Sequence, residues 1–180
     1  MGEVIIPPKL GLKSLMDIET AELFEKEALS WIDTPYFHMA KEKGKGADCA
    51  MFIAQCLYNV GIIYKVEAYY YSRSWMKTGT DELMVRGFEH HFRNYLNLGY
   101  TYAIYQVKGA RVEDFDNFEF EKLDILCFTS TGTVVCHHAG IYLGDGKMIH
   151  SYQGIGVNII KILYGWKKRL RYVLRISKIN

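Results

Sequence analysis

Apolar residues recur every three or four positions over residues 15–32, which is the spacing of one face of an α-helix. This helix is expected to end near Pro35, because the residue before a proline disfavours the helical conformation. A second helix is predicted to begin after Asp48, a good N-cap residue, and to end at Gly61, a good C-cap residue. Its apolar positions repeat on one face, and Cys49 lies in its first turn.

The last third of the chain has the pattern of β-strands. Gly144-Asp145-Gly146 is a strong β-hairpin signal between two apolar runs. Helices first and antiparallel strands afterwards are typical of an α+β fold. The runs predict strands at 123–128, 134–143, 147–152, 157–163 and 171–176.

The middle of the chain has a weaker pattern. Residues 37–47 are polar and contain glycine, which predicts a loop. Within 62–120 we expect a helix near 81–97 and a strand over 100–107. An aromatic run, Tyr69–Tyr71, precedes them.

Composition and charge exclude several classes of function. The chain has 180 residues and is 49% hydrophobic and 23% charged, so we expect one folded domain over 1–180, with an extended N-terminal arm over 1–14. A formal net charge of +2 gives no general reason to expect nucleic acid, and the basic residues gathered over 161–180 lack a base-reading pattern. No apolar run is long enough to predict a membrane span. We see no secretory signal at the start and expect synthesis in the cytoplasm.

Four cysteines without a CxxC pair do not make a disulfide framework. Cys49 differs from the others because the start of a helix stabilises a thiolate and offers unpaired amides to an oxyanion. The alternative for Cys49 is a small buried hydrophobe. Cys56, two turns further along the same face, is expected in the core, and Cys127 and Cys136 are expected to be structural residues of apolar strands. We therefore take Cys49 as the candidate nucleophile.

A thiol nucleophile needs a base, normally a histidine held by a third group. His38 lies in the loop before the nucleophile. His90 and His91 lie in the helix expected near 81–97, where packing or solvent exposure is the ordinary role. Three further histidines lie on the two hairpin strands: His137, His138 and His150.

Strand geometry leaves the choice of base open. Residues paired across a hairpin point to the same face. A three-residue turn over 144–146 would place His138 and His150 on one face, whereas a two-residue turn would place His137 there instead. A zinc site made of Cys136, His138 and His150 is a further alternative, but their spacing matches no short zinc motif and leaves the candidate nucleophile without a role. No metal is therefore expected.

Several segments resemble the NlpC/P60 cysteine peptidases. Together these segments cover most of residues 25–155, and their order and spacing match the family. The tail that contains Trp166, and the segments Tyr71–Trp75 and Glu82–Leu83, resemble the phage-type branch of the family. The segments that carry the main resemblance are Trp31-x-x-Thr-Pro-Tyr36, Gly46-Ala-Asp-Cys49-Ala-x-Phe52, Asp124-Ile-Leu-x-Phe128, His138-x-Gly-Ile-Tyr-Leu-Gly144 and Ile149-His150-Ser151.

The resemblance implies a papain-like fold, with the nucleophile helix packed on an antiparallel sheet. It implies an endopeptidase that hydrolyses amide bonds in peptidoglycan stem peptides, near D-glutamate, without a cofactor. In that mechanism Cys49 attacks the carbonyl, His138 is the base, and His150 orients His138. Tyr36 and Asp48 are implied as oxyanion- or substrate-binding residues, although Asp48 is expected to cap the helix more than to catalyse.

Two departures from the family pattern affect the expected groove. Met51 stands where the family usually has glycine, and its side chain could narrow the packing behind Cys49. The segment 62–120 is longer than in minimal members and is expected to be a family-variable insertion. It could form a flap or a groove wall, with Tyr69–Tyr71 as contacts.

Two other functions use the same residues. One is an amidase or acyl-transfer enzyme that acts on another substrate through the same Cys–His site. The other is a non-enzymatic phage-tail or structural module with a vestigial site. The absence of a signal at the start fits an enzyme that a phage tail or lysis delivers to the cell wall, and a fragment that lacks its own signal would look the same. The oligomeric state is not given by any pattern in the chain.

Overall fold

The computed structural model describes residues 3–6, 16–67, 81–107, 111–130 and 132–179. Its centre is a seven-stranded sheet in which every neighbouring pair is antiparallel. In spatial order the strands are β1 (Glu3–Ile6), β4 (Tyr100–Gln106), β9 (Leu170–Lys178), β5 (Ile125–Phe128), β6 (His138–Gly144), β7 (Lys147–Tyr152) and β8 (Gly156–Lys161). A second, two-stranded sheet pairs β2 (Lys41–Glu42) with β3 (Gly46–Ala47).

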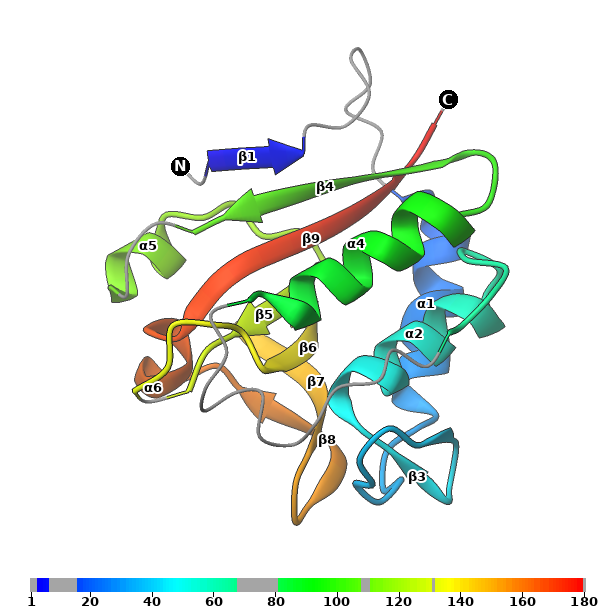
Figure 1. Cartoon of the computed structure of the whole chain (residues 1–180), viewed down its shortest axis with the longest axis horizontal. Coiled ribbons are helices and arrows are strands. Elements are labelled where there is room, and N and C mark those ends of the chain that lie inside the picture. Colours follow the sequence, from blue (N-terminus) through cyan, green and yellow to red (C-terminus); the bar gives the residue numbers. More distant parts are fainter. Residues whose placement is uncertain (1–2, 7–15, 68–80, 108–110, 131, 180) are drawn as a thin grey trace.

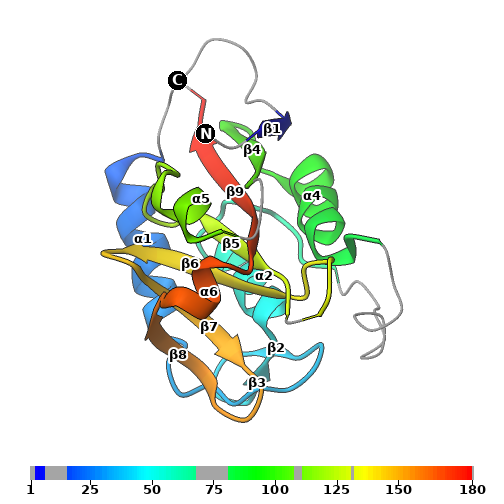
Figure 2. The same ribbon diagram turned by 90° about the vertical axis from the view of Figure 1, so that its left-hand side faces the viewer.

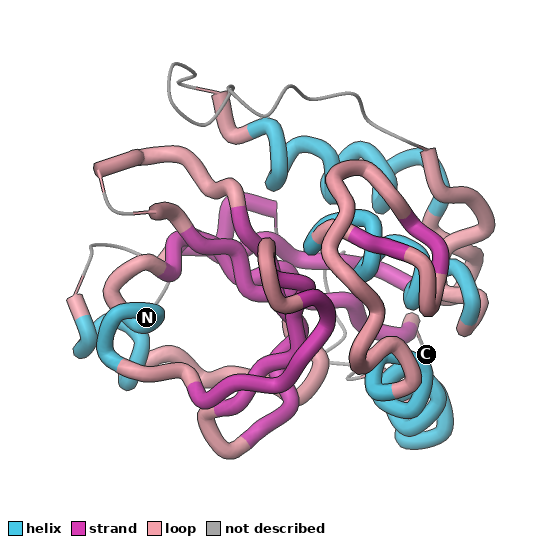
Figure 3. The backbone as a smooth tube through the Cα atoms, turned by 90° about the horizontal axis from the view of Figure 1, so that it is seen from below, coloured by secondary structure: helices cyan, strands magenta, loops and turns pink. Residues whose placement is uncertain are grey.

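Helices lie on both faces of the large sheet (Figure 1). Three lie on one face: α1 (Ile18–Leu29), α2 (Cys49–Asn59) and α4 (Leu83–Tyr95). The short helices α5 (Val112–Asp116) and α6 (Tyr164–Lys167) lie on the other face and stand in front of the sheet in Figure 2. Figure 3 shows the strands as the layer between the two groups. This arrangement confirms the expected α+β fold, with the nucleophile helix packed on an antiparallel sheet.

The two faces have separate apolar cores. Alternate residues of a strand point to opposite faces, so Ala139 and Ile141 of β6 pack with α2, whereas Tyr142 packs on the opposite face. Phe128 and Met148 also belong to the second core. Any side chain on β6 or β7 therefore belongs to the α2 face or to the α6 face according to its position in the strand.

The hairpin between β6 and β7 combines both of the turn types considered from the sequence. Asp145 and Gly146 form a two-residue turn, and both have the positive φ, 50° and 66°, that a type I′ turn requires. A β-bulge at Leu143 then adds one residue to β6. Beyond the bulge Tyr142 pairs with Met148, which is the register that a three-residue turn would have produced.

The start of β6 differs from the expected strand over 134–143. The strand begins at His138, and Val134 is 76% exposed. The backbone N–H of Cys136 donates to the Glu82 carboxylate at 2.8 Å, so a side chain takes the place of a strand partner. Cys136 is thus buried in the segment before the strand and not within it.

Other differences involve elements with weak local patterns. The helix expected over 15–32 begins at Ile18, because the Asp17 side chain accepts a hydrogen bond from the Thr20 amide and caps it. In the expected arm, Glu3–Ile6 forms β1 and pairs with β4 at the sheet edge. β4 itself lies within 62–120 and belongs to the central sheet. Tyr69–Tyr71 lie outside the described residues.

A buried ion pair joins β5 to the last strand. The Arg175 guanidinium donates to both carboxylate oxygens of Asp124, at 2.8 and 2.7 Å, and to Glu121 at 3.2 Å. Asp124 is 1% exposed and Arg175 17% exposed. Such a pair is expensive to break from one side, because the remaining charge stays buried without compensation.

We predict that Arg175→Leu lowers the free energy of unfolding by about 3 kcal/mol, since it leaves the Asp124 carboxylate buried without its cation. The measurement is urea denaturation followed by circular dichroism. Lys45→Ala, which removes the exposed ion pair with Glu42, serves as control and should lower the free energy of unfolding far less. An equal, small loss in both variants would show that the buried pair contributes no more than a surface pair.

Candidate active site

Asp48 fixes the start of α2. One carboxylate oxygen accepts the amide of Met51 at 2.8 Å, and the other accepts the amide of Met39 at 2.7 Å. The Asp48 side chain is 1% exposed, so both bonds are shielded from water. These contacts hold Cys49 at the first helical position and make Asp48 the helix cap expected from the sequence.

Cys49 lies where β6 and β7 part. The described ladder between these strands runs from the pair Ile141–Ile149 to the turn and does not reach Ala139. The Ala139 amide instead donates to the Cys49 sulfur. On the β7 side, the hydroxyl of Ser151 donates to the carbonyl of Ala47 at 2.7 Å. The start of α2 is therefore attached to both strands, at the residues that directly follow the two candidate histidines.

His138 and His150 form a directly bonded pair. His138 Nε2 lies 2.7 Å from His150 Nδ1, and the ring planes are 84° apart. Both side chains are buried. The bulge in the hairpin places the two on the same face of the sheet and directs His137 away from them. His137 Nε2 is buried and has no hydrogen-bond partner among the described residues.

An aromatic wall, made of Phe128, Tyr152 and Trp166, encloses the histidine pair. The Trp166 ring centroid lies 5.2 Å from that of His138 and 5.5 Å from that of His150. Tyr152 lies 5.6 and 5.5 Å from the same two rings, and Phe128 lies 6.4 Å from His138. The three side chains come from β5, β7 and α6, so they shield the pair on the face opposite α2.

The sequence reasoning did not identify this wall. Tyr152 follows His150 by two positions and Phe128 pairs with His138 across β5 and β6, so strand periodicity could have suggested both. Trp166 carried no comparable signal, because nothing local brings α6 to the hairpin.

Close packing also explains Gly140. A Cβ atom at this position would lie 2.9 Å from the Met148 sulfur and 3.3 Å from the Cβ of His150. A side chain here would crowd Met148, the Ile149 carbonyl and His150 together, so the glycine allows the two strands to approach.

Burial keeps the reacting groups neutral. It lowers the pKa of His138 far below its ordinary value, and the nearby His150, His137 and Arg169 act in the same direction. Burial also lowers the pKa of His150 to about 4. Burial and the charge of Asp48 raise the pKa of Cys49 to about 12, against the opposing effect of the amides that face its sulfur. At neutral pH the site therefore holds a thiol and neutral imidazoles.

Tyr36 and Met51 lie close to the nucleophile in the chain. The half-buried Tyr36 follows Pro35, whose carbonyl accepts the amide of Ala47 at 3.0 Å. This bond brings the Tyr36 loop alongside the segment that enters α2. Met51 is buried within the first turn of α2. The substrate role of Tyr36 and the effect of Met51 on the groove stay predictions.

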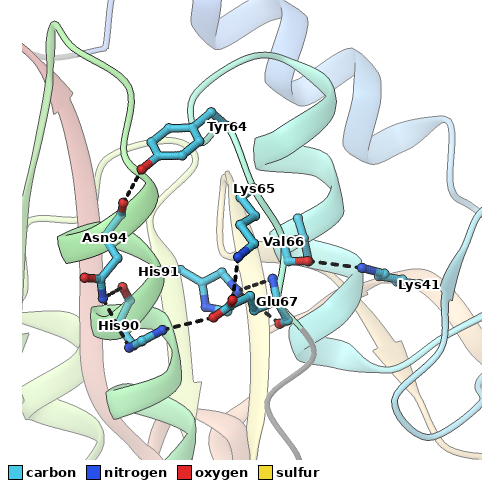
Figure 4. Close-up of polar contacts among 8 residues, drawn as sticks. All are labelled: Lys41, Tyr64, Lys65, Val66, Glu67, His90, His91 and Asn94. Carbon is cyan, nitrogen blue, oxygen red and sulfur yellow. Dashed lines mark hydrogen bonds and ion pairs between the residues drawn. The ribbon is translucent and has the colours of Figure 1, made fainter.

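The remaining histidines lie elsewhere. His91 is buried in α4, with Nδ1 2.8 Å from the Gly87 carbonyl, and His90 Nε2 lies 3.3 Å from the Glu67 carboxylate. Figure 4 shows His90 and His91 in contact with Glu67, and these contacts join α4 to the segment around Glu67. His38 Nδ1 lies 4.0 Å from the Asp48 carboxylate.

No metal site is assembled in the described part of the chain. Among these residues, no group of three histidine, cysteine, aspartate or glutamate side chains could hold an ion, and this includes the alternative of Cys136, His138 and His150. Within the same residues, no helix combines the length and apolar character needed to cross a membrane.

Comparison with known proteins identifies the fold. Solved structures match the fold: an NLP/P60 family protein similar to a lipoprotein from Staphylococcus aureus (16% identity, TM-score 0.57, 94% of this chain and 45% of that chain) and an NlpC/P60 family protein from Bacillus cereus (22%, 0.51, 85% and 39%). A third, the NlpC/p60 domain of the peptidoglycan hydrolase SagA, is 20% identical with a TM-score of 0.48, over 85% of this chain and 96% of that domain.

The chain spans less than half the length of the first two of these proteins. No curated protein matches it. The model of the NlpC/P60 family matches residues 33–175, which is well over half of the chain and includes Cys49, His138 and His150. The chain therefore belongs to the NlpC/P60 family.

Proposed function

We propose that this chain is a cysteine endopeptidase that hydrolyses amide bonds in peptidoglycan stem peptides, near D-glutamate, through Cys49, His138 and His150. The observation that carries the proposal is the bonded histidine pair, 2.7 Å apart, beside the start of the helix that presents a cysteine. Family membership supports the hydrolase class and the cell wall as the source of substrate.

The charge state of the resting site determines the order of events. Because the thiol and the imidazoles are neutral, no thiolate is stored before substrate binds. Attack on the carbonyl and transfer of the thiol proton to His138 are therefore coupled, and His138 later returns the proton to the leaving amine.

The bond between the histidines assigns their roles. When His138 Nε2–H donates to His150 Nδ1, the Nδ1 of His138 carries the lone pair that can accept the thiol proton. His150 thus fixes the tautomer and the ring orientation of His138 and stabilises the imidazolium that forms. Of the two histidines, His138 directly precedes the residue whose amide contacts Cys49, so it is the base in this proposal.

The start of α2 supplies donors for the oxyanion. Asp48 accepts the amides of Met51 and Phe52, through its side chain and its carbonyl respectively. The amides of Cys49 and Ala50 face the sulfur instead. They can bind the negative oxygen that develops as the sulfur attacks, together with the Tyr36 hydroxyl that the family pattern suggests.

We predict that Cys49→Ala and His138→Ala each reduce turnover by on the order of 10⁶-fold, because the nucleophile and base act as a unit. His150→Ala should be about 100-fold milder, since it only orients the base. The measurement is mass spectrometry of L-Ala-γ-D-Glu-diaminopimelate, or its lysine analogue, after incubation with each variant. Cys56→Ala, on the buried side of the same helix, is the control and should keep full activity. Undiminished cleavage by Cys49→Ala would refute the mechanism.

We predict that alkylation of Cys49 by iodoacetamide accelerates about tenfold per pH unit up to roughly pH 10, without a plateau, because the pKa of its thiol is raised to about 12 and only the thiolate reacts. Intact-mass kinetics of the wild type measure the rate, and Cys49→Ala corrects for the other three cysteines. A plateau below pH 8 would instead reveal a thiolate–imidazolium pair that exists before substrate binds.

We predict that Trp166→Leu moves the acid limb of the kcat/KM profile to higher pH by about one unit. Removing the ring admits water to the histidine pair, which raises the lowered pKa values toward 6.5, so protonation inactivates the base sooner. Tyr164→Leu, which changes an exposed ring on the same helix, should leave the profile in place. An unchanged profile in Trp166→Leu, with only a lower melting temperature, would limit the ring to packing.

A further inference from the structure

Arg169 is held against the aromatic wall of the active site. Its guanidinium carbon lies 4.2 Å from the centre of the Trp166 ring, and its Nε donates to the Gly165 carbonyl at 2.7 Å. The same Trp166 ring contacts His138 and His150. The cation therefore has a defined position, in contact with the same Trp166 ring that contacts the histidine pair.

Three other cations near the end of the chain have acidic neighbours. Lys167 pairs with Asp116, Lys178 with Asp17, and Arg175 with Asp124. Arg169 forms no ion pair with any described carboxylate, and among the described residues no acceptor bonds its two terminal amino groups. Lys161, Lys168 and Arg171 also have no described ion pair. The two lysines are exposed, whereas Arg169 is half-buried. Arg171 is half-buried too, but its Nη1 donates to the carbonyls of Lys168 and Leu170, both at 2.9 Å.

This cation opposes the chemistry of the site. The charge of Arg169 lowers the pKa of both His137 and His138, so it disfavours the imidazolium that His138 must become. No described acidic side chain offsets it. A bound anion would remove this penalty at the moment when substrate is present, because it would neutralise the cation beside the base.

We propose that Arg169 is a specificity-determining residue that binds a carboxylate of the substrate close to the scissile amide. The planar guanidinium matches a carboxylate with two parallel hydrogen bonds, and the terminal amino groups that would make them are the ones without a described acceptor. The inference rests on the proposed function and narrows its substrate to peptides with a free carboxylate beside the cleaved bond. A γ-linked glutamate keeps its α-carboxylate free in this position.

The test uses two stem peptides that differ in one group. One is L-Ala-γ-D-Glu-L-Lys with the free α-carboxylate of glutamate, and the other has the α-carboxamide of the same shape. Wild type should cleave the carboxylate peptide with a kcat/KM about 10- to 100-fold higher. This ratio corresponds to the free energy of a hydrogen bond to a charged group. Arg169→Gln should reduce this preference to near unity, mainly through slower cleavage of the carboxylate peptide. Arg169→Lys should retain part of it, as a point charge without the planar fork.

The matched control is Lys168→Gln, which removes the same charge one residue away and should leave the preference unchanged. Equal kcat/KM for both peptides in wild type would overturn the carboxylate site while leaving the peptidase intact. An equal loss of kcat/KM on both peptides in Arg169→Gln would also overturn the carboxylate site, and it would limit Arg169 to packing against the aromatic wall. Cleavage of neither peptide by wild type would refute the proposed function.

If neither peptide is cleaved, alkylation of Cys49 tests the carboxylate site separately. The quantity measured is the rate with iodoacetate divided by the rate with iodoacetamide. The ratio compares an anionic and a neutral reagent at the same sulfur. A lower ratio in Arg169→Gln than in wild type and Lys168→Gln would support anion binding there, and an unchanged ratio would overturn it.

Discussion

The extra residue at Leu143 is the constraint on which the active site depends. Side chains alternate between the faces of a strand, so one inserted residue exchanges the faces of everything beyond it. Without the bulge, the two-residue turn at Asp145-Gly146 would direct His137 toward His150 and turn His138 to the α2 core. With it, His138 and His150 meet on the α6 face, and Ala139 turns its small side chain toward α2. The hairpin thus separates the bulky imidazoles from the close-packed helix interface.

The same hairpin also allows the nucleophile to approach from the opposite face. A continuous ladder between β6 and β7 would use the amide of Ala139 within the sheet. Because the strands part beyond Ile141, that amide is available to the Cys49 sulfur. The side-chain hydroxyl of Ser151 adds a second attachment, to the Ala47 carbonyl. Asp48 then sets the helix start relative to these two attachments. The site is held by hydrogen bonds among segments far apart in the chain, so its geometry depends on the whole fold.

Local signals predicted the parts of this structure that depend on local forces. The N-cap at Asp48, the apolar face of α2 and the short hairpin turn follow from capping and periodicity, and the resemblance to the family singled out His138. Strand parity alone could not make that choice, because a bulge leaves no clear trace in an apolar run. The late start of β6 was missed because the Cys136 amide donates to Glu82, a residue 54 positions earlier in the chain. Trp166 was missed for the same reason, because its contacts with the histidine pair join α6 to β6 and β7, which are distant elements of the fold.

The dry environment of the site has opposite effects on its two reacting groups. Burial raises the pKa of Cys49 and lowers that of His138, so it makes the thiolate–imidazolium state costly from both sides. Two fixed charges add to this cost, since Asp48 disfavours the thiolate and Arg169 disfavours the imidazolium. The amides at the start of α2 stabilise the thiolate, but in the resting site they do not outweigh burial and the Asp48 charge. The remaining stabilisation must therefore come with the substrate, through its carbonyl at the helix amides and through a negative group near Arg169. A site built in this way holds little thiolate at neutral pH and becomes fully reactive only when a substrate of the matching charge is bound.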